Sequence, residues 1–495
     1  MGAPPDAVVV GAGHNGLVAA AYLARSGLRV IVLERRAVVG GAAATEEIHP
    51  GFRASTASYA LSLLRPDVHR DLELARHGLE VVAKDPQMLV PLEGGGHLRV
   101  WRDASRTRAE LAALGEGEGY DRWCRFWGEA VVRLRPLVDA PDPPPPAEVE
   151  RIVGPEIWRL AVAGSAAATV ERFFAHPGVR GAFASQGIIG TARSVLDEGT
   201  AWVMAYHALG GELYGSAGTW GFVRGGMGAL SGALRRSAEA AGAEVRCGAG
   251  VSEIVVDGGR ASGVRLADGT VVPARVVLSG ADPKTTFLRL VPPDTLDPAF
   301  VQRVREWRSP GCVLKVNLAL SEAPRFPDLR GTIEIAPSID YLHAAWEDAA
   351  AAGFSRRPFM EVFVQSAVDP TLVDGGGHVV SAFTQYVTED ADVSEATEAV
   401  LDTLASYSPG LRETVVACDA LGPRELEARF GLWGGNIFHG EITPEQCFGG
   451  RFGHRTPVPG LYLCGSGARP GGGVMGAAGR NAAKVVVRDV LRDDG

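Results

Sequence analysis

Cysteine is scarce in this sequence, and long apolar runs are absent. The chain of 495 residues contains six cysteines, and no two of them form a CxxC pair. A chain of this length without paired cysteines is typical of a cytoplasmic protein with reduced thiols. No stretch approaches the roughly 20 apolar residues that a membrane span needs. The start, MGAPPDAVVV, also lacks the regions of a secretory signal. We therefore predict a cytoplasmic protein and leave peripheral membrane contact open.

Basic clusters, repeats and metal-ligand patterns are missing as well. The net charge is −9 with both signs mixed along the chain, so nucleic acid is not an expected partner. We find no repeat with a period of roughly 20–50 residues and no catalytic triad pattern, and we predict no metal site. The composition is that of a globular protein, and the length indicates about two to three domains. The oligomeric state stays open.

A dinucleotide-binding pattern opens the chain. The stretch VVVGAGHNGLVAAAYLARSGLRVIVLERR (8–36) predicts a buried strand, a glycine turn, a helix and a second strand that ends in an acid. Gly11 permits the tight turn, Gly13 lets the backbone approach a pyrophosphate, and Gly16 lets the helix pack close to the strand. Glu34 is placed to accept hydrogen bonds from ribose hydroxyls, which argues against NADP. The pattern alone does not separate NAD from FAD.

The C-terminal region repeats part of this pattern. GLYLCGSG (460–467) predicts a buried strand that ends in glycines, and GGGVMGAAGRNAAKVVVRDVL (471–491) predicts a second junction of glycines and a helix. We expect residues 474–476 to open that helix, with N–H groups aimed at an anion or a polarised carbonyl. Such a return of the chain is difficult to explain with NAD alone.

The middle of the chain predicts two β-rich regions. Residues 251–280 predict a β-meander whose last strand, ARVVLSG, shares a sheet with the first motif. Between about 285 and 449, the segments CVLKVNLAL, FMEVFVQS and HVVSAFTQYV indicate an antiparallel sheet flanked by helices. PQMLVPLEGGGHLRVW (86–101) predicts a further hairpin.

Together these motifs resemble the phytoene desaturase-type flavoproteins of the carotenoid desaturase and amine oxidase superfamily. Within it, the chain is most similar to the subgroup of pyridine nucleotide-disulfide oxidoreductase domain-containing protein 2. The resemblance spans nearly the whole chain and is carried by VVGAGHNGLVAAAYLA, HPGVRGAFASQGIIG, WGFVRGGMGALSGAL, GGNIFHGEI and LYLCGSGARPGGGVMGAAGRNAA. It implies an α/β fold with a Rossmann-like FAD-binding domain of the glutathione-reductase type and a discontinuous α+β substrate domain built on an antiparallel sheet. The implied boundaries are 1–84, 219–284 and 450–495 for the first domain, and 85–218 and 285–449 for the second.

The resemblance also implies non-covalent FAD. The residues implied to contact it are Gly11, Gly13, Gly16, Glu34, Arg36, Gly40, Gly41, Val251, Gly465, Ser466, Val474, Met475, Gly476 and Ala477. Ser466 departs from the disulfide reductases, which have an aspartate at that position. A CxxC pair and a second nucleotide-binding domain are also missing, so we do not expect disulfide reduction despite the name of the subgroup.

Three residues are candidates for catalysis. His439 lies in the glycine-flanked loop GGNIFHGEI just before the returning segment, where it binds substrate, accepts a proton or simply orders the loop. Glu441 shares that loop. Arg469 stands where many relatives have histidine; it holds an anionic substrate or the reduced flavin, or it pairs with an acid.

We expect an FAD-dependent dehydrogenase or desaturase that acts on an apolar small molecule, with isoprenoids as one candidate class. A hydride would pass from a C–H bond to flavin N5, and O2 or a quinone-like acceptor would take the electrons. An amine-oxidase-like enzyme and a flavoprotein with a structural or redox-neutral isomerase use of FAD are the alternatives.

Overall fold

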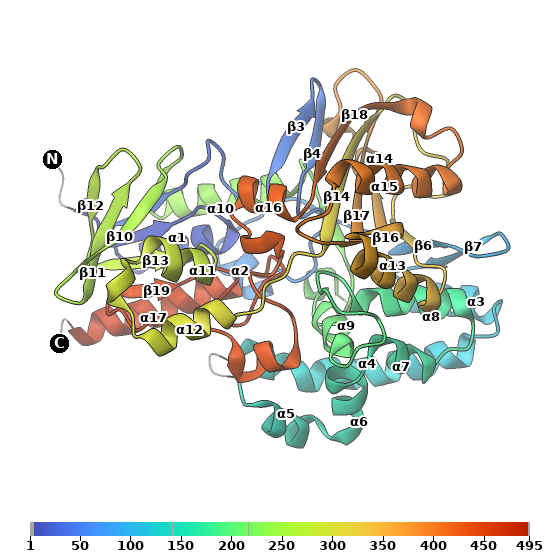
Figure 1. Ribbon diagram of the computed structural model, residues 1–495, viewed down its shortest axis with the longest axis horizontal. Helices are drawn as coiled ribbons and strands as arrows, with labels where there is room; N and C mark the ends of the chain where they lie inside the picture. The colour runs from blue at the N-terminus through green and yellow to red at the C-terminus, as the bar shows by residue number, and fades with distance from the viewer. Residues whose placement is uncertain (1–3, 141–142, 216, 494–495) are drawn as a thin grey trace.

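A five-stranded parallel sheet organises one half of the molecule (Figure 1). The computed structural model describes residues 4–140, 143–215 and 217–493. In spatial order the strands are β19 (Leu461–Leu463), β13 (Val276–Ser279), β1 (Ala7–Val10), β2 (Val30–Leu33) and β9 (Glu244–Arg246). The helix α1 (His14–Arg25) connects β1 to β2, as predicted. The predicted sharing of one sheet by the first motif and the last meander strand is confirmed, because β1 pairs with β13.

Both faces of this sheet are buried at its central strands, which explains the apolar residues of β1, β2 and β13, whereas the edge strand β9 is partly exposed. Side chains alternate between the faces, so Ala7 and Val9 pack with one core while Val8 and Val10 pack with another. The first core includes the helices α1, α10 (Met227–Ala240) and α17 (Ala477–Asp493). The second includes the antiparallel strands β10 (Val251–Asp257), β11 (Arg260–Leu266) and β12 (Val271–Pro273).

A seven-stranded sheet organises the other half. Its order is β18 (Val415–Leu421), β14 (Val313–Leu320), β17 (His378–Val387), β16 (Phe354–Val364), β15 (Thr332–Ile335), β6 (Met88–Pro91) and β7 (His97–Val100). The predicted hairpin is β6 and β7, and the three predicted central strands are present. The sheet is mixed rather than purely antiparallel, because β6 runs parallel to β15. The β6–β7 hairpin joins from a distant part of the chain, so no local signal fixes its direction.

The two faces of this larger sheet differ in character. On β14, Leu314, Val316 and Leu318 pack toward α15 (Val393–Tyr407) in one core. Val313 and Lys315 alternate to the opposite face, where a cavity lies. That side also carries the helices α4 (Gly117–Asp139), α7 (Ala166–Glu171), α8 (Pro177–Ala184) and α9 (Thr200–Ala208).

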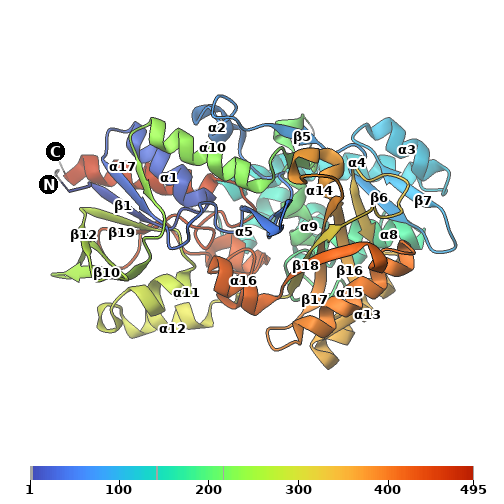
Figure 2. The ribbon, with the colours of Figure 1, turned by 90° about the horizontal axis from the view of Figure 1, so that it is seen from above.

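The two halves lie side by side, with both termini in the parallel-sheet half (Figures 1 and 2). Short pieces lie between them: β3 (Thr45–His49), β4 (Phe52–Ser55), β5 (Val81–Ala83), β8 (Gly221–Val223) and α16 (Pro423–Phe430). No helix in the described part of the chain is both long and apolar enough to cross a membrane. The exact domain boundaries stay a prediction.

Candidate functional site: a cofactor cavity between the two sheets

The turn between β1 and α1 leaves open space beside Gly13. The φ angle of Gly11 is 92°, a conformation that favours glycine. A Cβ atom on Gly16 would lie 2.1 Å from the carbonyl oxygen of Gly11, so only glycine allows this close packing. A Cβ atom on Gly13 would meet no atom within 4 Å. The N–H of Gly40 donates to the carbonyl of Ala12 at 2.8 Å and attaches the second pair of glycines to this turn.

Glu34 is buried at the end of β2 and joins two parts of the turn. Its carboxylate accepts the Ala12 N–H at 2.8 Å and the Arg36 N–H at 2.9 Å. Each carboxylate oxygen keeps a lone pair for a second donor, such as a ribose hydroxyl. Arg36 pairs with Glu46, and its guanidinium lies 5.0 Å from the ring centroid of Phe430.

A cavity of about 400 Å³, called the main cavity below, extends from Glu34 past the glycine turn to the seven-stranded sheet. This volume is in the range of small-molecule and cofactor sites. The predicted cofactor residues that line it are Gly11, Gly13, Gly16, Glu34, Arg36, Gly40, Gly41, Val251, Gly465, Ser466 and Val474. Its far end is formed by Ile189, His207, Lys315, Phe383 and Phe438.

The last four predicted FAD contacts, residues 474–477, do not lie as the sequence indicated. The helix α17 begins at Ala477, so the prediction that residues 474–476 open it was wrong. The φ angles of Val474 and Gly476 are 59° and 72°, and these left-handed conformations keep the chain out of the helix. Val474 still lines the main cavity, whereas Met475, Gly476 and Ala477 are not among its described lining residues.

His439 lines the main cavity in a strained backbone conformation, with a φ angle of 55°. Its Nδ1 lies 3.8 Å from Oδ2 of Asp282, and neither atom has a hydrogen-bond partner among the described residues. Burial lowers the pKa of His439 to about 4 and raises the pKa of Asp282 to about 7. The imidazole is therefore neutral at pH 7.

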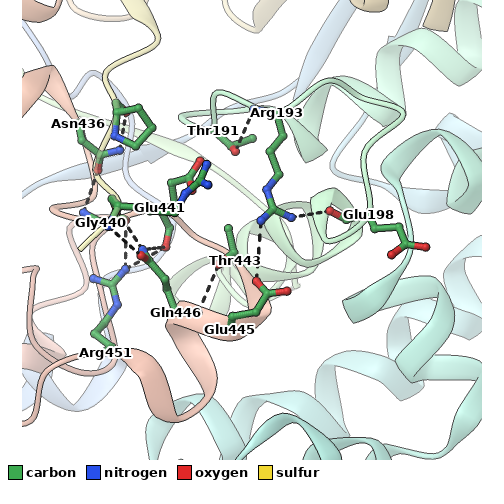
Figure 3. A network of polar contacts seen from close by, with 12 residues as sticks. Thr191, Arg193, Glu198, Asn436, Gly440, Glu441, Thr443, Glu445, Gln446 and Arg451 are labelled. Carbon is green, nitrogen blue, oxygen red and sulfur yellow. Dashed lines mark hydrogen bonds and ion pairs between the residues drawn. The ribbon is translucent and has the colours of Figure 1, made fainter. Parts of the chain in front are cut away.

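Glu441 and Arg469, the other catalytic candidates, are not among the described residues that line the main cavity. Glu441 is fully buried, and its carboxylate accepts a hydrogen bond from Arg308 Nε at 2.9 Å. Figure 3 shows it beside Gln446, whose side-chain amide donates to the Glu441 carbonyl at 3.2 Å. Arg469 donates from Nε to the Arg451 carbonyl at 3.2 Å. These contacts order the loop around His439, so contact with substrate is not supported for either residue.

Two further residues escaped the sequence analysis. Arg451 is fully buried and donates to the Gly440 carbonyl at 3.1 Å (Figure 3). It also donates to the Ser466 carbonyl at 2.7 Å, which ties the His439 loop to the returning segment. Lys315 lies at the far end of the main cavity, 4.2 Å from the ring centroid of Tyr59. Burial lowers the pKa of Lys315 well below its ordinary value. The signal for Lys315 was a charged residue inside a mainly apolar strand.

The residues present fit FAD. The glycine turn accommodates a pyrophosphate, and Glu34 can accept ribose hydroxyls. Several buried polar atoms of cavity-lining residues have no hydrogen-bond partner among the described residues: His14 Nε2, Arg36 Nη1, Lys315 Nζ and His439 Nδ1. Buried polar groups normally have partners, and a polar cofactor along this cavity would supply them.

Comparisons with known proteins agree with this interpretation. Residues 9–73 match the family described as NAD(P)-binding Rossmann-like domain, and residues 159–487 match the family described as flavin containing amine oxidoreductase. The protein named pyridine nucleotide-disulfide oxidoreductase domain-containing protein 2 of Mus musculus is 39% identical over 98% of this chain and 94% of its own length.

A more distant relative and a solved structure extend the comparison. The phytoene desaturase (neurosporene-forming) of Cereibacter sphaeroides is 26% identical over 96% of this chain and 92% of its own length. The solved structure of wild-type putrescine oxidase bound to putrescine has a TM-score of 0.64 at 19% identity, and the match covers 98% of this chain and 99% of that one. The second likeness shows a shared fold.

Proposed function

Because the chain belongs to the family of flavin-containing amine oxidoreductases and is an FAD-dependent oxidoreductase, we propose that it removes a hydride from a C–H bond of an apolar small molecule. Isoprenoids are the leading candidate class, since a phytoene desaturase is among the relatives. FAD, when bound, supplies the hydride acceptor at its N5 atom. O2 or a quinone-like molecule is the proposed final electron acceptor.

The observation that carries this proposal is the apolar far end of the main cavity. Ile189, Phe383 and Phe438 form its walls, and the far-end residues include no carboxylate. Walls of this kind exclude water and position a C–H bond by shape. A substrate cation would find no carboxylate to pair with among these far-end residues.

The chain's polar residues have distinct proposed parts. Glu34 holds the ribose of the cofactor, and Gly13 makes room for its pyrophosphate. His439 is a buried base with a pKa of about 4, so its neutral form can accept or pass a proton at Nδ1. Lys315 is a second buried base, whose pKa is lowered by burial, and its Nζ is the other proposed proton acceptor. Arg451 fixes the loop that carries His439.

Amine oxidation is the second candidate, since the putrescine oxidase structure has the same fold. The test is to mix the holoprotein anaerobically with an acyclic isoprenoid hydrocarbon, with a primary amine and with a cis-polyene, and to follow the visible absorption of the flavin. Bleaching by the hydrocarbon is the expected result. Bleaching by the amine alone would replace the proposal with amine oxidation, and isomerisation of the polyene without bleaching would replace it with redox-neutral use of FAD.

The proposed substrate also bears on location. We propose a cytoplasmic protein that receives its poorly soluble substrate at a membrane surface, by peripheral contact. Co-sedimentation of the holoprotein with phospholipid vesicles tests this. Failure to sediment with vesicles, both with and without an added isoprenoid, would contradict the membrane contact.

A further inference from the structure

A second cavity of about 380 Å³, called the side chamber below, adjoins the main cavity. Tyr59, Ala60, His207 and Trp220 line both, so the two spaces meet at these residues. Much of the side chamber is aromatic and apolar, with Trp123 and Trp127 of α4 and Phe183 and Met204 of the neighbouring helices. A largely apolar molecule fits this lining.

A polar cluster lies on the wall of the side chamber formed by the seven-stranded sheet. Gln186 and Glu361 line the chamber, and Glu334 lies behind them, fully buried. The Gln186 amide donates to Glu361 at 3.3 Å and to Glu334 at 3.4 Å. The hydroxyl of Tyr59, which also lines the main cavity, donates to Glu361 at 2.5 Å.

Lys84, which directly follows β5, also lines the side chamber and completes this cluster. Its ammonium donates to the hydroxyl of Thr332 and lies 4.9 Å from the ring centroid of Phe363. This hydrogen bond to Thr332 leaves two of the three N–H donors of Lys84 for another acceptor. Lys84 therefore offers donors beside the acceptor oxygens of Glu361.

The charges in this region balance. Glu334 and Glu361 are matched by two buried lysines, Lys84 and Lys315. Burial, followed by repulsion from Glu361, raises the pKa of Glu334 well above its ordinary value, and burial lowers the pKa of Lys315 well below its own. Whether these two groups are ionised or both neutral, the four side chains sum to zero charge. A ligand ion of either sign would face one like and one opposite charge between Lys84 and Glu361, and so would gain no net attraction.

We propose that the side chamber binds the substrate and that Lys84, Gln186 and Glu361 recognise an uncharged head group, a hydroxyl, on its otherwise apolar body. A hydroxyl donates one hydrogen bond and accepts others, which matches the donors of Lys84 and the acceptors of Glu361. A full charge of either sign loses its hydration, and the balanced charges of Lys84 and Glu361 give it no net attraction to offset that loss. This inference rests on the proposed function, because it assigns a substrate class to the same enzyme.

The first test is a ligand series with one body and four head groups. Binding of 1-decanol, decylamine, decanoate and decane to the holoprotein is measured by quenching of tryptophan emission. We expect decanol to bind about 10-fold more tightly than each of the other three, a difference of about 1.4 kcal/mol. Equal or tighter binding of the amine or the acid would overturn the uncharged head group, and equal binding of decane would show that the cluster recognises no head group.

The second test disturbs the charge balance without touching the main cavity, which neither Lys84 nor Glu361 lines. Glu361→Gln leaves an excess of positive charge and should raise decanoate affinity relative to decanol. Lys84→Met leaves an excess of negative charge and should raise decylamine affinity instead. Glu389→Gln, at an exposed position after β17, is the control and should change neither ratio. Unchanged ratios in both chamber variants would contradict the inference.

Flavin readings separate this inference from the proposed function. Both chamber variants should keep the flavin content of the wild type, which also reports folding. A decanol preference without anaerobic bleaching by any C–H donor would count against the proposed reaction alone. Bleaching by an apolar donor combined with no decanol preference would count against the head-group assignment alone.

Discussion

The two ends of the main cavity are lined by different parts of the chain, backbone at one end and side chains at the other. At the Glu34 end the walls are mainly backbone, with glycines at 11, 13, 40 and 41 and N–H groups around the turn. At the far end the walls are side chains that project from one face of the seven-stranded sheet and from α9, among them Lys315, Phe383 and His207.

This difference separates two kinds of specificity. A backbone wall recognises what lies against it through fixed N–H groups and through the absence of Cβ atoms. A side-chain wall can change its shape and charge one residue at a time while the strand beneath it stays the same. Cofactor choice should therefore be rigid, and substrate choice adjustable, in proteins built on this plan.

The largest expected effect comes from adding side chains to the backbone wall. Gly13→Val should give folded protein that binds FAD at least about 100-fold more weakly, because its side chain enters the open space beside the turn. Gly16→Val should instead prevent folding, since its Cβ would lie 2.1 Å from a carbonyl oxygen. Flavin content and circular dichroism separate the two outcomes.

Gly453→Val is the matched control for this pair. A Cβ atom on Gly453 also meets nothing within 4 Å, and this residue is not among the described lining of the main cavity. It should keep its flavin. Wild-type flavin content in Gly13→Val would remove the basis for the backbone wall as the pyrophosphate site.

A smaller loss is expected at the one essential side chain of the backbone wall. Glu34→Ala removes the acceptor for ribose and the bonds to Ala12 and Arg36. FAD binding should weaken by about 1.5–3 kcal/mol, the value of a hydrogen bond to a charged group. Titration of apo-protein with FAD measures this, with Glu253→Ala on β10 as the control. An unchanged dissociation constant would show that Glu34 only braces the turn.

At the side-chain wall, a change should affect the reaction and leave the cofactor in place. Lys315→Met removes a buried base at the far end and should slow anaerobic flavin reduction by about 100-fold, which is typical of a lost proton-transfer group. Flavin content should stay at the wild-type level. Exposed Lys484→Met is the control. Equal reduction rates in Lys315→Met and the wild type would leave Lys315 with a packing role.

Sequence reasoning succeeded for the parallel-sheet half because its signals are local. One short segment contains the first strand, the glycine turn, the helix, the second strand and Glu34. The glycines there serve close backbone approach, and Glu34 serves as a hydrogen-bond acceptor. The same holds for the three central strands of the larger sheet, which are rich in β-branched and aromatic residues. The start of α17 was missed because left-handed φ angles at Val474 and Gly476 are set by tertiary contacts rather than by helix propensity.

The row of buried charged residues on the seven-stranded sheet could not be assembled from the sequence. Lys315, Glu334 and Glu361 lie on three different strands, and each has apolar residues on both sides in the sequence. They meet because the strands pair and because alternate residues face the same side. Pairing partners and the parallel entry of β6 depend on the whole topology, so only the structure brings these charges together. The pairing of buried Glu441 with the exposed side chain of Arg308 has the same cause.

The smallest expected effect is a pH dependence at the junction of the two cavities. Burial lowers the pKa of His207 from its ordinary 6.5 to about 4. Between these values the unfolded chain holds a proton on this residue that the folded protein rejects. The contribution of His207 to stability is therefore complete above pH 6.5 and is lost as the pH falls toward 4, with a slope of at most about 1.4 kcal/mol per pH unit.

Urea unfolding of the holoprotein at several pH values measures this contribution. In His207→Gln, the free energy of unfolding should fall less steeply with decreasing pH than in the wild type, by up to that slope. Exposed His97→Gln should follow the wild type. A parallel loss of stability in His207→Gln and the wild type between pH 6.5 and 4 would contradict this prediction. It would show that water reaches His207 and solvates its charged form, so that the water-excluding side-chain wall does not extend to this residue.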